Sequence, residues 1–133
     1  MARILVVDDD EAVSGTYLRM LQVTGHDGSA VVDATQGLDV LRSSRPDALL
    51  VDMRMPGLSG LEFLRRLRAD PENQSLPVGI VTGVFVKDEE MREIEALGAI
   101  LKHKPIWLDD MSALLDRLLL PPPVAAGSPA PIS

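Results

Sequence analysis

The chain contains no cysteine among its 133 residues. Disulfide bonds and cysteine-ligated metals are therefore excluded, and a reducing compartment, the cytoplasm, is the expected location. Aromatic residues make up only 3% of the sequence, so a hydrophobic core must be built from aliphatic side chains and methionine. No apolar run approaches the roughly 18 residues that indicate a membrane span. The first residues also lack the apolar region of a signal peptide.

Basic residues are fewer than acidic ones. The chain has 13 Lys and Arg against 20 Asp and Glu, which gives a formal net charge of −7. Nucleic-acid binding needs clustered cationic side chains to neutralise phosphates, so direct contact with nucleic acid is not expected. The length of 133 residues and the hydrophobic fraction of 46% fit one globular domain.

Short apolar runs alternate with longer amphipathic stretches. Runs that are apolar throughout are typical of parallel strands covered on both faces, and the weaker second run is expected at an edge. This alternation predicts an α/β fold, a doubly wound five-stranded parallel sheet with five helices on both faces. The predicted strands are 3–7, 29–33, 47–51, 78–82 and 99–103, and the predicted helices are 11–24, 36–44, 60–69, 88–97 and 109–120.

Local signals mark several boundaries. Ser59 and Glu62 have the spacing of a capping box ahead of the third predicted helix, and Gly98 stands where the fourth should end. Three consecutive prolines begin the segment 121–133, which is otherwise rich in Ala, Gly, Ser and Pro. We therefore expect one domain over 1–120, followed by a disordered tail or linker.

Polar residues of particular kinds close four of the predicted strands. Asp8 and Asp9 follow the first, Asp52 the third and Thr82 the fourth, while Lys104 follows the fifth. The carboxyl ends of parallel strands share one edge of a sheet, so these side chains should meet in one crevice. Carboxylates, a hydroxyl and an ammonium group suit a Mg²⁺ ion and the transfer of a phosphoryl group to an aspartate.

Each of these residues has an ordinary explanation when taken alone, because an aspartate after a strand is commonly a turn former or a helix cap. Their combination on separate strand ends is what favours a site. In that interpretation Asp52 is the nucleophile, and Asp8 and Asp9 complete a hard oxygen site for Mg²⁺. Lys104 supplies a mobile positive charge, and Thr82 supplies a hydroxyl that can donate to a phosphoryl oxygen.

The same positions carry a family resemblance. The segment D-M-R-M-P-G-L-S-G at 52–60, together with Asp8-Asp9, Thr82-Gly83 and Lys104-Pro105, resembles the receiver domain of two-component response regulators. The resemblance covers about residues 2–120 in the correct order. It implies the flavodoxin-like strand order 2-1-3-4-5 of chemotaxis receivers.

The resemblance also implies a role for each matching residue, and a cis peptide bond before Pro105. These roles are the phosphoacceptor for Asp52, a direct Mg²⁺ ligand for Asp9, a ligand acting mostly through water for Asp8, a metal-binding backbone carbonyl for Arg54, the switch hydroxyl for Thr82 and the phosphate-binding lysine for Lys104.

Two departures from the family pattern concern the fifth strand. Leu101 stands three residues before Lys104, where the family usually has Tyr or Phe, and Ile106 replaces a frequent Phe after Pro105. The output face built by the fourth helix, fifth strand and fifth helix is therefore expected to be atypical. Trp107 is expected to pack at the start of the last helix, with contact to a partner as the alternative.

The expected function is that of a phosphorelay response regulator. A histidine kinase or histidine phosphotransfer protein would phosphorylate Asp52, and the domain would then switch its contacts with a downstream protein, as a monomer or weak homodimer. It would be no enzyme beyond catalysing its own phosphorylation and dephosphorylation. The alternative is a receiver-like docking module that works without phosphorylation. A metal-dependent phosphatase is disfavoured because no second acid stands two residues after Asp52.

Overall fold

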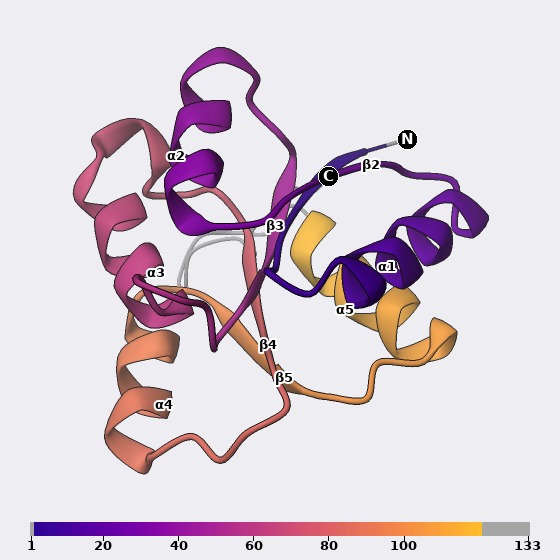
Figure 1. Ribbon diagram of the computed structural model, residues 1–133. Helices are drawn as coiled ribbons and strands as arrows, with labels where there is room; N and C mark the ends of the chain where they lie inside the picture. The colour runs from indigo at the N-terminus through magenta and orange to yellow at the C-terminus, as the bar shows by residue number, and fades with distance from the viewer. Residues whose placement is uncertain (1, 121–133) are drawn as a thin grey trace, which may run out of the picture.

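The computed structural model describes residues 2–120, which form a sheet between two layers of helices (Figure 1). The sheet has five parallel strands in the order β2-β1-β3-β4-β5, so the predicted fold class and strand order are confirmed. The elements are β1 (Arg3–Val7), α1 (Glu11–Val23), β2 (Asp27–Val31), α2 (Ala34–Ser43), β3 (Ala48–Asp52), α3 (Gly60–Ala69), a 3₁₀ turn (Pro71–Asn73), β4 (Val78–Thr82), α4 (Asp88–Ala96), β5 (Ile100–His103) and α5 (Leu108–Leu119).

The helices cover the sheet on both faces, and each face has its own core. Helices α2, α3 and α4 lie on one face, where Phe63 is fully buried among aliphatic residues. Helices α1 and α5 lie on the other, around Leu21 and Met111. The strands β3 and β4 are buried along their whole length, as expected for nearly continuous apolar runs at the centre of such a sheet.

The second strand differs most from the prediction. It spans Asp27–Val31 instead of 29–33, and it pairs with β1 from Arg3↔Asp27 to Val7↔Val31. It is an edge strand, as expected, and most of its residues remain accessible to solvent. Because an edge strand needs little apolar character, its polar first residues gave no strand signal.

Helix ends follow the local chemistry of the sequence. Ser59 and Glu62 form the predicted capping box of α3, and Gly98 takes a positive φ of 77° directly after the last turn of α4. The expectation that Trp107 packs was wrong, because its side chain is 67% exposed where α5 begins. Its neighbour Ile106 is the residue that enters the core beside α5.

Within residues 2–120, no helix combines the length and the apolar character needed to cross a bilayer. The tail expected over 121–133 lies outside the described residues.

Candidate functional site

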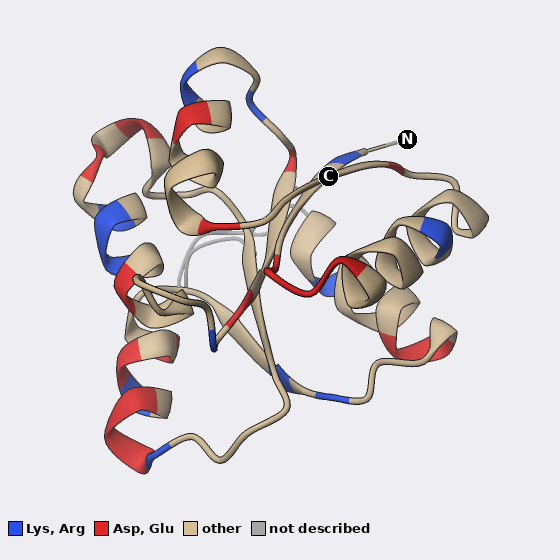
Figure 2. Ribbon diagram, viewed as in Figure 1, with Lys and Arg blue, Asp and Glu red and all other residues tan. Residues whose placement is uncertain are grey.

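Three carboxylates meet at the carboxyl edge of the sheet. Val7 and Val51 are register partners in β1 and β3, so the residues that follow them, Asp8 and Asp52, emerge side by side. With Asp9 they offer carboxylate oxygens that all lie within 4.8 Å of one another. Figure 2 shows these acidic segments converging at one edge of the sheet. The predicted acidic cluster therefore exists as a compact group.

The backbone around Asp52 is held by the turn into α3. The amide of Gly60 donates to the carbonyl oxygen of Met53 at 2.9 Å, which brings the start of α3 against the end of β3. A Cβ atom on Gly60 would lie 2.5 Å from the carbonyl oxygen of Asp52. Only glycine allows this approach, so residue 60 contributes to the placement of the carboxylate without bearing a side chain.

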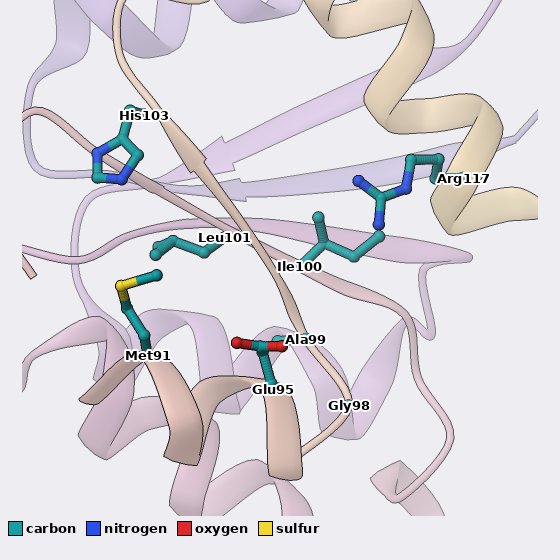
Figure 3. A pocket seen from close by; sticks show the side chains of 8 residues that line it. All are labelled: Met91, Glu95, Gly98, Ala99, Ile100, Leu101, His103 and Arg117. Atoms are coloured by element: carbon teal, nitrogen blue, oxygen red, sulfur yellow. The ribbon is translucent and has the colours of Figure 1, made fainter. Parts of the chain in front are cut away.

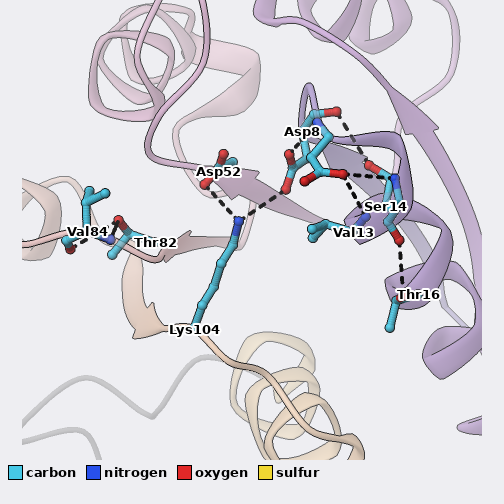
Figure 4. Close-up of polar contacts among 10 residues, drawn as sticks. Asp8, Val13, Ser14, Thr16, Asp52, Thr82, Val84 and Lys104 are labelled. Carbon is cyan, nitrogen blue, oxygen red and sulfur yellow. Dashed lines mark hydrogen bonds and ion pairs between the residues drawn. The ribbon is translucent and has the colours of Figure 1, made fainter.

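Lys104 reaches into the acidic cluster from the end of β5 (Figure 4). Its Nζ atom lies 3.4 Å from Oδ1 of Asp52 and 3.6 Å from Oδ2 of Asp8. The Lys104 amide donates to the carbonyl oxygen of Thr82 at 2.7 Å, which fixes the lysine backbone beside β4. The peptide bond between Lys104 and Pro105 is cis, as the family resemblance implied.

Burial sets the ionisation of the two inner carboxyl groups. The pKa of Asp8 is raised, first by desolvation and then by repulsion from Asp52, while a hydrogen bond from the Asp10 amide opposes the rise. The pKa of Asp52 is also raised by desolvation, against the attraction of Lys104 and a backbone hydrogen bond from Arg54. The ionised site is therefore short of positive charge even with Lys104 present.

This donor set fits a divalent cation. Carboxylate oxygens are hard ligands of the kind that Mg²⁺ accepts, usually one or two of them together with water and phosphate oxygens. Asp8 and Asp52 are 2% and 8% exposed, whereas Asp9 is exposed at the mouth of the cluster. A cation placed there would favour the ionised forms of Asp8 and Asp52, whose pKa values are raised mainly by burial.

Thr82 lies at the end of β4 but its hydroxyl is engaged elsewhere. The residue is fully buried, and the residue before it in the chain, Val81, is the register partner of Asp52 in β3. The Thr82 Oγ1 atom accepts a hydrogen bond from the Val84 amide at 3.1 Å and lies 3.4 Å from the Val84 carbonyl oxygen. Figure 4 shows this pair apart from the contacts of Lys104. This hydrogen bond therefore holds the start of the β4–α4 loop in this conformation.

A groove that the sequence did not predict lies beside the cluster. Its volume is about 490 Å³, and α1 and the segment after β5 form its walls. Tyr17 contributes to the α1 wall, and burial together with the nearby charges of Asp8 and Asp52 raises its pKa to about 12. The sequence gives no sign that Tyr17 borders the charged cluster, because its spacing from other apolar residues of α1 indicates only a buried helix face. Asp10, by contrast, caps α1, as an aspartate after a strand commonly does.

A second hollow lies on the face formed by α4, β5 and α5. Its volume is about 490 Å³, and Figure 3 shows Leu101 and Met91 directed toward each other on one side of it, with Arg117 of α5 on another. Leu101 is partly buried and packs against the core under α4. Leu101 stands where the family usually has an aromatic residue. It thus makes an aliphatic contact between β5 and α4.

Comparisons with known proteins agree with this geometry. Residues 4–116 match the model of the response regulator receiver domain. The response regulator MprA of Mycobacterium avium is 37% identical over 117 residues, which is 88% of this chain and 50% of the relative. The chain thus spans about half the length of the curated relatives it matches.

Solved structures give the same fold. The chemotaxis protein CheY4 of Vibrio cholerae superposes with a TM-score of 0.82 at 27% identity, over 90% of this chain and 99% of that one. A response regulator receiver domain protein of Clostridium thermocellum gives a TM-score of 0.79 at 26% identity, over 90% of this chain and 94% of that one. The chain therefore belongs to the response regulator receiver domain family of two-component signalling proteins.

Proposed function

We propose that this domain accepts a phosphoryl group on Asp52 from a histidine kinase or histidine phosphotransfer protein and then changes its contacts with a downstream protein. The observation that carries the proposal is the position of the Lys104 ammonium group, 3.4 Å from Asp52 and 3.6 Å from Asp8. A mobile cation beside a carboxylate can follow negative charge as it develops on a transferred phosphoryl group.

The transfer is a displacement at phosphorus. A carboxylate oxygen of Asp52 forms a bond to phosphorus while the bond from phosphorus to the donor's imidazole nitrogen breaks. The electron pair of that bond stays with the imidazole, which takes up one proton and leaves as neutral histidine. Asp52 becomes an acyl phosphate, and later attack by water returns it to the carboxylate and releases inorganic phosphate.

Asp8, Asp9 and Asp52, with the backbone carbonyl of Arg54, would hold Mg²⁺. When bound, the ion supplies positive charge to the phosphoryl oxygens. The chain's own contribution is positional: the end of β3 presents Asp52, and Lys104 offsets part of the negative charge of Asp8 and Asp52. Thr82 would donate its hydroxyl to a phosphoryl oxygen once it leaves Val84.

The groove beside Tyr17 suits the phosphodonor protein. It is mostly apolar, it measures about 490 Å³, and Lys104 and Ile106 form part of its lining. A helix seated there would bring a histidine toward Asp52, because Lys104 belongs both to the groove and to the acidic cluster. The apolar wall would provide contact area, and the cluster would provide the chemistry.

The test is incubation of the whole chain with acetyl phosphate and Mg²⁺, followed by intact-mass measurement. We expect the mass of one phosphoryl group on the wild type and none on Asp52→Asn. Asp10→Asn is the matched control, because it removes a neighbouring charge while asparagine still caps α1. An unmodified wild type would refute the proposal. A partner affinity that is equal with and without phosphorylation would favour the docking-module alternative.

A further inference from the structure

β5 has Leu101 at the position where the family usually has an aromatic residue, but another aromatic residue lies near Thr82 in the sequence. The chain has two phenylalanines, one tyrosine and one tryptophan. Phe63 of α3 is fully buried, and Tyr17 of α1 is also buried. Phe85 lies in the β4–α4 loop three residues after Thr82, and its side chain is 82% exposed. This is the aromatic residue nearest in sequence to the proposed switch hydroxyl.

The loop places Phe85 next to an anchored residue. Val86 is 3% exposed and belongs to the core under α4, so the loop is held at that point. On the other side, Gly83 joins the loop to β4, and a Cβ atom there would meet Lys104 at no less than 3.6 Å. A short segment with one free aromatic between a glycine and a buried valine can rotate without disturbing the core.

A hollow lies beside Phe85, between the β3–α3 turn and the start of α4. Its volume is about 320 Å³, and Phe85 itself forms part of its lining. The hollow has a polar rim that includes Glu62 and Glu90, with Met53 and Met55 as its apolar part. Met53 and Met55 offer thioether contacts to a ring, and Arg54 lines the hollow beside them.

The loop is held in its present conformation by Thr82, the residue whose hydroxyl a phosphoryl group on Asp52 would recruit. Thr82 Oγ1 accepts from the Val84 amide at 3.1 Å, and this hydrogen bond fixes the residue next to Phe85. If Thr82 turns to donate to a phosphoryl group on Asp52, the Val84 amide loses its partner and the loop is released. This step rests on the function proposed above.

We propose that Phe85 is the aromatic switch residue of this domain: release of Val84 by Thr82 lets the Phe85 ring close over the hollow lined by Met53 and Met55. Burial of an exposed phenylalanine is favourable by the hydrophobic effect, so the closed loop would help to hold the phosphorylated conformation. Leu101 needs no movement in this scheme, since it already packs against the core. The signal would leave through the β4–α4 loop and the start of α4.

The composition of the chain permits a direct test. Labelling the wild-type protein with fluorophenylalanine gives two ¹⁹F signals, because Phe63 and Phe85 are the only phenylalanines. Phe63 is fully buried and serves as the internal reference. A soluble paramagnetic agent then reports the exposure of each ring, before and after addition of Mg²⁺ and beryllium fluoride as the phosphoryl mimic. The Phe85→Leu variant assigns the signals.

We expect the relaxation enhancement of the Phe85 signal to fall about twofold or more on binding of the mimic, while that of Phe63 stays constant. The same response should be lost in Thr82→Ala. In an unlabelled series, Phe85→Ala should weaken binding of the mimic about tenfold, Phe85→Tyr should restore it, and Leu101→Ala should leave it near the wild-type value.

The outcomes separate this inference from the proposed function. If acetyl phosphate adds phosphoryl mass but the Phe85 signal stays equally accessible with the mimic bound, the switch assignment is overturned and the phosphoacceptor role stands. A response of Phe85 that persists in Thr82→Ala also overturns the assignment. If neither acetyl phosphate nor the mimic reacts with the wild type, both proposals fall together.

Discussion

The ammonium group of Lys104 lies 3.4 Å from a carboxylate oxygen of Asp52. The same ammonium group lies 3.6 Å from Asp8, so one half-buried cation serves two carboxylates that are both almost inaccessible to solvent. Removal of the ammonium group would therefore leave two carboxylates without a counter-charge, whereas removal of one carboxylate would leave Lys104 paired with the other.

The first prediction concerns this lysine. Lys104→Ala should lower the free energy of unfolding of the metal-free protein by about 1–3 kcal/mol at neutral pH, because two buried carboxylates lose their counter-charge. Urea denaturation in the presence of a chelator measures the effect, and Mg²⁺ should reduce it. Lys102→Ala is the control, since Lys102 pairs with Asp110 at 3.7 Å on an accessible surface. Equal losses for the two variants would contradict the prediction.

The second prediction concerns pH. Burial raises the pKa of Asp52 in the folded state, so the unfolded chain loses that proton at a lower pH than the folded one. Stability from this group is therefore present below the ordinary value of 3.8 and is lost as pH rises through the raised value.

Asp52→Asn should consequently be more stable than the wild type at neutral pH without metal, and its advantage should disappear toward acid pH. Denaturation curves for both proteins across this range give the difference directly, which cancels the pH dependence of the groups that do not interact with Asp52. An advantage that is constant with pH would argue against the assigned cause.

The third prediction concerns metal affinity. Asp9→Asn should weaken Mg²⁺ binding by about tenfold or more, because it removes one of three carboxylates whose oxygens lie within 4.8 Å. Isothermal titration of the metal-free protein provides the dissociation constant. Asp10→Asn provides the comparison, because it removes one negative charge next to the cluster and retains the cap of α1. Similar losses in both variants would indicate a general effect of charge.

The fourth prediction concerns the lifetime of the acyl phosphate. Val84 is 37% exposed, and its backbone, not its side chain, is bound by Thr82. Val84→Asn should therefore keep the hydrogen bond to Thr82 in the unphosphorylated protein, while replacing an apolar side chain with a group that can orient water. We expect hydrolysis of the acyl phosphate to accelerate about threefold or more, measured by loss of phosphoryl mass with time. An unchanged half-life would exclude this role.

Much of the fold could be predicted because the central strands are simple to recognise. The run 78–82 was predicted with its final bounds, since a strand buried on both faces must be apolar throughout. The edge strand was displaced by two residues, because Asp27 and Ser29 need only backbone hydrogen bonds to join β1. The capping box of Ser59 and Glu62 was visible because both partners are local in sequence.

The candidate site was predictable in composition but not in conformation. Strand order alone brings the end of β3 beside the end of β1, so the meeting of Asp8 and Asp52 follows from the topology. The hydrogen bond between Thr82 and Val84 does not, because a hydroxyl at a strand end has several acceptors within reach. The exposure of Trp107 was also missed, since sequence periodicity cannot distinguish the last loop residue from the first residue of a packed helix.

The close approach of Gly60 to Asp52 limits which residues position 60 can accept. An added methyl group would press on the backbone oxygen of Asp52, and a shift of that strand end would carry the carboxylate out of line with an approaching phosphorus atom. A substitution that adds a single carbon at residue 60 would therefore impair the proposed phosphoryl transfer, although this residue touches neither metal nor phosphate.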